Sequence, residues 1–232
     1  MSPDRVAALY DIHGNLHALD AVLAEVDADL ILVGGDAVAG PWPSETLECL
    51  LELGDGVRFI RGNADREVAS ELPGLAPPAV MNFVRKQLTE EQIAFLGTWP
   101  LTESIDVDGL GPILFCHATP RSDDEILTRI SAEERWQVAL AGVDEPTVVC
   151  GHTHVQFDRL IGETRVVNSG SVGMPYEDEP GAYWTVLGPE VEFRRTQYEA
   201  GDIQATGWPE ELPTATPEEA TDFFEGLSLG QA

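Results

Sequence analysis

The sequence opens with the run Arg5-Val6-Ala7-Ala8-Leu9-Tyr10-Asp11-Ile12-His13-Gly14-Asn15, an apolar stretch that ends abruptly in polar residues. A continuous apolar run of this length predicts a strand that is buried on both faces. Residues 16–28 follow with apolar side chains at helical spacing, which predicts a helix directly after the polar turn. The same apolar-then-polar pattern recurs at residues 30–36 and 57–63. Strands that alternate with helices in this way favour a parallel sheet in a layered α/β fold.

The second half of the chain shows a different order of predicted elements. Strands are predicted first at residues 101–107, 112–116 and 147–150, and then in close succession at 156–161, 164–168, 182–187 and 191–198. Hairpin-like turns join the strands of that last group, which predicts a second, mostly antiparallel sheet. Further helices are expected at residues 44–53, 79–88, 90–97, 131–141 and 217–225.

Length and composition indicate one globular domain. We expect a single domain over residues 1–232, with a core at about 5–198 and an acidic, Pro- and Glu-rich extension at 199–232. The sequence lacks the apolar stretch that a membrane helix needs, and its first residues lack the layout of a signal peptide. Three cysteines, at 49, 116 and 150, form no CxxC motif. Together these features predict a cytoplasmic protein with reduced thiols and no membrane contact.

The chain is strongly acidic, with 41 Asp and Glu against 13 Lys and Arg and a formal net charge of −28. Such a surface repels phosphate backbones, so nonspecific nucleic-acid binding is not expected. The excess charge is explained by solubility or by a salty or GC-rich background. If the substrate is an anion, a local positive charge such as a metal ion must overcome this field.

Seven polar side chains follow the predicted strands at the ends where sites form in layered α/β folds. A single histidine is more often structural than a ligand, but four of the five histidines occupy such strand ends. Mixed imidazole and carboxylate ligands suit Mn²⁺, Fe or Zn²⁺. Seven ligands are too many for one tetrahedral ion and instead suit two ions that share a carboxylate. The candidate ligands are Asp11, His13, Asp36, Asn63, His117, His152 and His154.

The order of these motifs resembles that of the calcineurin-like metallophosphoesterases, and of their small prokaryotic phosphodiesterase branch in particular. The resemblance rests on the following stretches: Asp11-Ile12-His13-Gly14-Asn15, Gly35-Asp36, Gly62-Asn63-Ala64-Asp65, His117 and Gly151-His152-Thr153-His154. The turn at residues 168–175 also resembles this branch, with Ser169 where Pro is more usual. The resemblance implies a four-layer αββα sandwich of two mixed β-sheets flanked by helices.

The resemblance also implies a dinuclear, metal-dependent phosphoester hydrolase. Asp11, His13 and His154 would hold one metal ion, and Asn63, His117 and His152 the other. Asp36 would bridge both ions, and a metal-bridging hydroxide held near Asp36 and Asn63 would be the nucleophile. We expect Mn²⁺, with Fe, Zn²⁺ or Ni²⁺ as alternatives.

The sequence departs from the family at Ala64, where many members carry a histidine that protonates the leaving group. Because alanine has no proton to give, phosphodiesters or esters with good leaving groups are favoured as substrates. His17 is a candidate surrogate acid, and the alternative is a solvated residue in the first turn of a helix. Asp65 either orients a catalytic group or caps a helix that starts near Arg66.

Three further residues are candidate substrate contacts. Arg121 would clamp a phosphate, or instead form a surface ion pair with Asp123 or Asp124. Trp42 would stack on a nucleobase, or pack on its neighbouring prolines. Asn15 begins the first helix and would also line the site.

Other functions stay open at this point. Within the family these are a phosphomonoesterase, a protein phosphatase or a dinucleoside polyphosphate hydrolase. A protein-binding scaffold without catalysis is the alternative from another class, and Phe223-Phe224 would then be its partner surface. We expect a small-molecule phosphoester as the ligand, and the sequence leaves a homodimer open.

Overall fold

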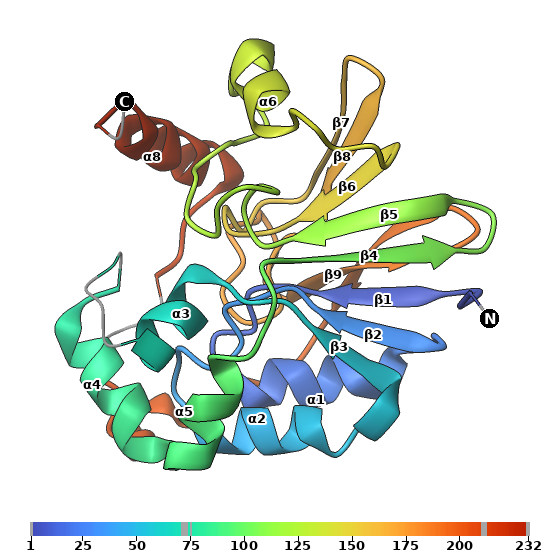
Figure 1. Cartoon of the computed structure of the whole chain (residues 1–232). Helices are drawn as coiled ribbons and strands as arrows, with labels where there is room; N and C mark the ends of the chain where they lie inside the picture. Colours follow the sequence, from blue (N-terminus) through green and yellow to red (C-terminus); the bar gives the residue numbers. More distant parts are fainter. Residues whose placement is uncertain (1, 71–73, 75, 210–212, 231–232) are drawn as a thin grey trace.

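The computed structural model describes residues 2–70, 74, 76–209 and 213–230, and it contains two five-stranded sheets packed face to face (Figure 1). The first sheet has the order β10 (Val191–Thr196), β9 (Ala182–Leu187), β1 (Val6–Leu9), β2 (Leu30–Val33) and β3 (Val57–Phe59). The second has the order β4 (Thr102–Val107), β5 (Gly111–Cys116), β6 (Thr147–Cys150), β8 (Thr164–Asn168) and β7 (Phe157–Ile161).

Helices cover the outer faces of both sheets, which confirms the expected αββα sandwich. Figure 1 shows α1 (Leu16–Glu25) and α2 (Pro43–Leu51) beneath the first sheet, and α6 (Glu133–Ala139) beyond the second. The remaining helices are α3 (Asn63–Ser70), α4 (Pro78–Gln87), α5 (Glu90–Leu96), α7 (Ile203–Thr206) and α8 (Pro217–Gly230), with a short 3₁₀ turn at Gly54–Gly56.

Alternation along β1 explains the layers. Val6 and Ala8 pack between the two sheets, where they meet Phe115 of β5. Ala7 and Leu9 point the other way and pack against the helices beneath the first sheet. Since side chains on a strand alternate between faces, a strand with two buried faces must be apolar throughout, as β1 is.

The last four predicted strands do not form one antiparallel sheet. β7 and β8 join the second sheet, which is mixed because β8 is parallel to β6. β9 and β10 join the first sheet, where β9 runs antiparallel to β1. All six residues of β9 are buried, so this strand needs a layer on each side. A position beside β1, between helices and the second sheet, supplies both layers.

Several helices differ from the predictions at their ends. α1 stops at Glu25 rather than residue 28, and α8 continues to Gly230 rather than ending at residue 225. α3 begins at Asn63 rather than near Arg66, and the short α7 was not predicted. Both of these helices are too short for apolar spacing to identify them.

None of the helices in the described part of the chain combines the length and the apolar character required to cross a bilayer.

One hydrogen bond ties the two sheets together, and it provides a test of the packing. The buried Tyr10 hydroxyl donates to the carbonyl oxygen of Val149 in β6, at 2.9 Å. We expect Tyr10→Phe to lower the free energy of unfolding by about 1 kcal/mol, because a buried acceptor loses its side-chain partner while the ring stays packed. Urea unfolding with an unchanged m-value is the measurement. Unchanged stability would show that this bond does not hold the sheets together.

Candidate metal centre

The candidate ligands gather at one end of the sandwich because each follows the carboxyl end of a strand. Asp11 and His13 follow β1, Asp36 follows β2, and Asn63 follows β3 at the start of α3. The second sheet contributes three histidines from the segments after β5 and β6, which are His117, His152 and His154. Both sheets therefore supply ligands to the same edge, where parallel strands end together.

Six of the seven candidates form two groups that could each hold a metal ion. Asp11, His13 and His154 form one group, and Asp36, His117 and His152 form the other, with the ligand atoms of each group within 4.8 Å of one another. Asp36 Oδ2 lies 3.6 Å from His117 Nε2 and 3.9 Å from His13 Nε2, so its carboxylate stands between the two groups.

Four polar atoms of this cluster are buried without a hydrogen-bond partner among the described residues. They are Asp11 Oδ1, Asn63 Oδ1, His117 Nε2 and His152 Nε2. An unpartnered buried polar atom is destabilising by about 1–3 kcal/mol, so folded proteins rarely keep one without a reason. Four such atoms on neighbouring imidazole, carboxylate and amide groups fit divalent metal ions as their missing partners.

In five of the ligands the side-chain atom opposite the metal-facing one already has a backbone partner. The Nδ1 atoms of His117, His154 and His13 lie 2.9, 2.7 and 3.2 Å from backbone carbonyl oxygens. A proton held on Nδ1 by a carbonyl leaves Nε2 as a lone-pair donor for a metal. The carboxylates follow the same rule, since Asp11 Oδ2 accepts from a backbone N–H at 2.8 Å, as does Asp36 Oδ1.

Five of the candidate ligands have a left-handed backbone. Their φ angles are +52° at Asp11, +47° at His13, +50° at Asp36, +66° at His152 and +57° at His154. Within the described ranges these are the residues other than glycine with positive φ. Such backbone is strained for L-residues and concentrates at functional sites, where the surrounding structure must hold it.

Asp65 holds two of the ligand-bearing segments together. Its carboxylate accepts hydrogen bonds from the backbone N–H groups of Gly62, Asp36 and Ala37, at 2.9, 2.7 and 3.1 Å. It therefore does not cap a helix near Arg66. Burial raises the pKa of Asp65 to about 6.

Burial and mutual repulsion set the charge of the imidazoles. Burial, with the neighbouring histidines, lowers the pKa of both His13 and His152 to about 3, so both rings are neutral lone-pair donors near pH 7. Burial raises the pKa of Asp36 to about 7, with Asp65 and Asp11 adding repulsion. Burial also opposes the ionisation of Asp11. The surrounding histidines, of which His154 contributes most, outweigh burial and hold the pKa of Asp11 well below its usual range.

Asn15 begins α1, as the sequence predicts. Its Oδ1 accepts from the backbone N–H of Ala18 at 3.2 Å, and its Nδ2 donates to the Gly173 carbonyl and to the Tyr198 hydroxyl. The side chain thus joins the first helix to the turn after β8. Its proposed contact with substrate stays a prediction.

The other three expected contacts lie outside the hollow that contains the metal ligands, as far as the described residues define it. His17 is exposed on α1, and its ring meets Trp42 edge-on at 4.9 Å. Arg121 forms a surface ion pair with Glu125 rather than with Asp123 or Asp124. Asp123 instead pairs with Arg61 and Arg66. The roles of His17, Trp42 and Arg121 toward substrate stay predictions.

The hollow at the metal ligands has a volume of about 420 Å³ and an apolar side that the sequence did not reveal. Tyr176, Trp208, Phe223, Phe224 and Leu227 line it together with the ligands. Tyr176 and Trp208 lie in irregular segments with no motif, so no signal in the sequence identified them. The structure places Phe223 and Phe224 beside the metal ligands, and Phe224 also packs in the core with Ile126 and Val155; the role of the pair as a partner surface stays a prediction.

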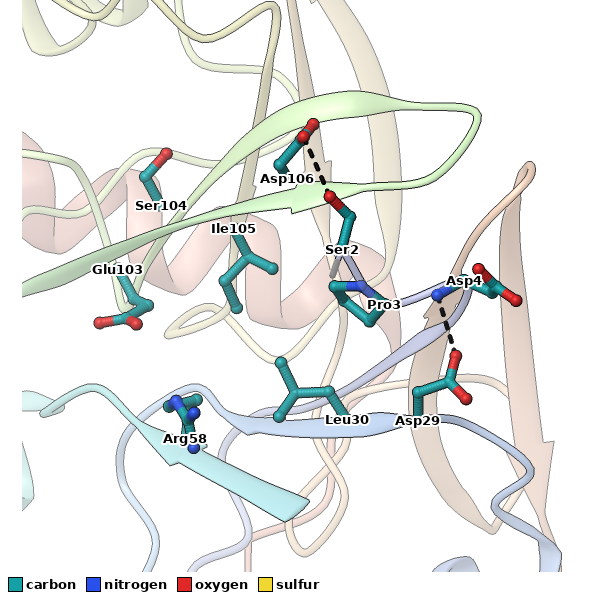
Figure 2. A pocket seen from close by; sticks show the side chains of 10 residues that line it. All are labelled: Ser2, Pro3, Asp4, Asp29, Leu30, Arg58, Glu103, Ser104, Ile105 and Asp106. Carbon is teal, nitrogen blue, oxygen red and sulfur yellow. Dashed lines mark hydrogen bonds between the residues drawn. The ribbon is translucent and has the colours of Figure 1, made fainter. Parts of the chain in front are cut away.

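A larger hollow of about 790 Å³ lies at the opposite end of the strands, and Figure 2 shows its lining. Asp4, Asp29, Glu103 and Asp106 surround it, with Arg58 as the cation. Hydrogen bonds from Ser2 to Asp106 and from the backbone of Asp4 to Asp29 occupy part of this polar lining. It contains no histidine and none of the unpartnered buried atoms, so its size alone does not make it the site.

Comparison with known proteins agrees with this geometry. A family model described as "Calcineurin-like phosphoesterase superfamily domain" matches residues 5–187. The crystal structure of a metallophosphoesterase from Sphaerobacter thermophilus is similar, with a TM-score of 0.70, 25% identity and coverage of 95% of this chain and 98% of that one.

Two curated sequences are also similar. An uncharacterized protein of Methanocaldococcus jannaschii is 24% identical, over 86% of this chain and 90% of its own length. A symmetrical bis(5'-nucleosyl)-tetraphosphatase of Klebsiella pneumoniae is 31% identical over 126 residues. That alignment covers 50% of this chain and 44% of the tetraphosphatase.

Metal counting tests the two ligand groups. We expect about two Mn²⁺ ions per wild-type chain, and about one after His13→Ala or His152→Ala, because each variant removes a ligand from a different group. His17→Ala is the matched control for metal content, since that histidine belongs to neither group. Elemental analysis after dialysis is the measurement. One ion in the wild type, or equal loss in His17→Ala, would contradict the assignment.

The backbone support of His13 gives a second test. A Cβ atom on Gly40 would lie 1.5 Å from the carbonyl oxygen of His13, so Gly40→Ala must displace the His13 segment. We expect metal affinity to fall by about 10–100-fold although every ligand remains, as happens when supporting contacts of metal ligands are lost. Gly56→Ala is the control, because a Cβ there meets nothing within 4 Å. Equal affinity in both variants would show that this contact does not position the ligand.

Proposed function

The chain belongs to the calcineurin-like phosphoesterase superfamily, and from this premise we propose that it is a dinuclear metal-dependent phosphodiesterase acting on a small organic or nucleotide phosphate. The observation that carries the proposal is the set of four buried, unpartnered atoms on the candidate ligands, three of them within the two ligand groups and the fourth on Asn63. A cluster built for structure alone would have satisfied these atoms with hydrogen bonds.

The ligand set suggests how two ions would be held. Asp11, His13 and His154 would hold one ion, and Asn63, His117 and His152 the other, with Asp36 between them. When bound, the ions would supply positive charge for the phosphoryl oxygens and lower the pKa of water. We propose Mn²⁺ because the donors are a mixture of imidazole nitrogen and carboxylate or amide oxygen, with Fe, Zn²⁺ and Ni²⁺ as alternatives.

The preference for diesters rests on Ala64. This residue lines the hollow, and its backbone N–H donates to Asp36 Oδ1 at 2.8 Å, but its methyl group has no proton for a leaving group. General acid catalysis contributes about 10²–10⁴-fold, and its absence harms poor leaving groups most. We therefore propose phosphodiesters with stabilised leaving groups as the preferred substrates.

A dinucleoside polyphosphate is the second candidate substrate, and the similarity to the symmetrical tetraphosphatase favours it. That similarity covers half of this chain and includes no more than part of the tetraphosphatase. Release of nucleoside diphosphates from diadenosine tetraphosphate, compared with hydrolysis of a simple diester, separates the two candidates.

The remaining proposals follow from composition. Three free cysteines, two of them buried, support a reducing cytoplasm. The net charge of −28 supports a small phosphoester rather than a nucleic acid as the ligand, and a homodimer is compatible with this role.

Paired activity measurements test the proposed function. We expect Mn²⁺-loaded wild type to hydrolyse bis-p-nitrophenyl phosphate faster than p-nitrophenyl phosphate. Asp36→Ala should reduce diester turnover by at least about 100-fold, because the carboxylate between the two ligand groups is lost. A chelator-treated sample restored by added Mn²⁺ is the control.

Two outcomes would contradict the proposal in different ways. Preference for the monoester would overturn the inference from Ala64. Absence of turnover with either ester and with diadenosine tetraphosphate, despite two bound ions, would favour the protein-binding scaffold.

A further inference from the structure

The hollow at the metal ligands is chemically divided. His13, Asp36, Asn63, His152 and His154 line one side. The other side is an apolar wall, by which we mean Tyr176, Trp208, Phe223, Phe224 and Leu227. A volume of about 420 Å³ is within the usual range for small-molecule pockets, so one ligand can contact both sides.

The apolar wall is joined to the ligands by ring contacts. Tyr176 stacks on His154 with ring centroids 5.1 Å apart and an angle of 18° between the planes. The ring centroid of Phe224 lies 6.2 Å from that of Tyr176 and 6.3 Å from that of His152. If the metal ions hold the phosphate of a substrate, a flat ring beside that phosphate would therefore contact these aromatic side chains.

Helix α8 holds the wall in place through polar contacts on its other side. Glu225 accepts hydrogen bonds from Thr128 and Ser131, and Arg135 donates to Ser228 at 3.1 Å. Phe224 and Ala220 pack on Ile126 and Val155. In Figure 1, α8 lies at the same end of the molecule as α3 and α4. The part of the wall that α8 carries is thus packed on the rest of the fold.

Two features of the wall leave room for a ligand contact in the described part of the chain. Phe223 is 62% exposed and Leu227 is 39% exposed, although both line the hollow. Trp208 Nε1 is buried and has no hydrogen-bond acceptor there. Exposed aromatic and aliphatic side chains around a concave site are typical of ligand binding, and a free indole N–H can meet an acceptor on the ligand.

Charge decides what kind of group fits. No lysine or arginine is among the described residues that line the hollow. A second phosphate or a carboxylate would therefore find no cation away from the metal ligands, in a chain of net charge −28. The part of the substrate that faces the wall must be uncharged and apolar, and the ring contacts favour a flat aromatic group.

We propose that the apolar wall binds an uncharged aromatic ring in one ester group of the substrate, so that the site selects phosphodiesters that carry an aryl group or a nucleobase. This inference rests on the proposed phosphodiesterase function, and it adds the specificity of the site. Hydrolysis adds the OH of water to phosphorus, breaks one P–O ester bond and delivers the other proton of water to the oxygen of the departing alcohol or phenol. The wall takes no part in these steps.

Inhibition by slowly hydrolysed diesters tests the wall directly. Dimethyl phosphate, diphenyl phosphate and the methyl ester of thymidine 5'-monophosphate each carry one negative charge, and they differ in their rings. They are compared as competitive inhibitors of bis-p-nitrophenyl phosphate hydrolysis by the Mn²⁺-loaded enzyme. We expect at least one ring-bearing diester to inhibit about tenfold or more tightly than dimethyl phosphate, in line with measured stacking on aromatic side chains.

Substitutions in the apolar wall test whether the difference in inhibition arises there. Phe223→Ala removes an exposed ring without opening the core, and Trp208→Ala removes the indole, so both should reduce the ratio of inhibition constants to below about threefold. Trp208→Phe keeps a ring but loses the N–H, and it separates stacking from the hydrogen bond. Leu160→Ala is the matched control, since this residue is 69% exposed on β7 and outside the hollow. It should keep the wild-type ratio.

Every outcome has a meaning. Selectivity for diphenyl phosphate alone assigns aryl esters, and selectivity that extends to the thymidine ester assigns nucleotide esters. Equal inhibition by all three diesters, or a ratio that survives both alanine variants, overturns the inference while hydrolysis itself still stands. If neither of the two p-nitrophenyl esters nor diadenosine tetraphosphate is hydrolysed, the proposed function fails, and the same ratio is then measured by thermal stabilisation of the metal-loaded chain.

Discussion

Left-handed backbone at five candidate metal ligands is the constraint on which the rest of the structure depends. Each such residue is destabilising by about 1–3 kcal/mol, so together they approach the whole net stability of a typical domain, about 5–15 kcal/mol. The strain persists because each segment is held from several sides. Asp65 fixes the segments of Asp36 and Gly62, and the close approach of Gly40 fixes His13. Fully buried apolar strands, β1 and β6, anchor the segments of Asp11, His13, His152 and His154.

The same arrangement reconciles a strongly acidic chain with a negatively charged ligand. Buried imidazoles at His13 and His152 stay neutral, so these two ligands do not supply the missing positive charge. Two carboxylates and four unpartnered atoms instead favour cations, and cations in turn favour phosphate. Metal ions would thus relieve the buried polar atoms and reverse the local field in one step. The acidic surface can then serve solubility without excluding a small anionic substrate.

Site residues could be predicted from the sequence where polar side chains follow an apolar run within a short segment. They could not be predicted where the site is assembled from distant segments that have no motif or periodic pattern. Asp11, Asp36 and Asn63 could be found because each directly follows an apolar run, and the carboxyl ends of such strands meet. The sheet membership of β9 could not be found, because hairpin spacing does not say which sheet a hairpin joins. Tyr176 and Trp208 likewise belong to segments without periodicity. Their positions depend on how the chain returns after β8 for Tyr176 and after β10 for Trp208, which local pattern does not encode.

The place of β9 beside β1 has a consequence for how the protein is made. Thr185, the fourth residue of β9, pairs with Ala8 of β1. One neighbour of β1 is therefore synthesised nearly 180 residues after β1 itself. During synthesis, β1 and β2 emerge early with one edge unprotected, and that edge is a template for mispairing until β9 arrives. Folding that depends on so distant a pairing is slow, because the entropy cost of closing the long loop comes before the strand contacts can stabilise the chain. The open edge of β1 therefore persists through translation until the last strands have left the ribosome.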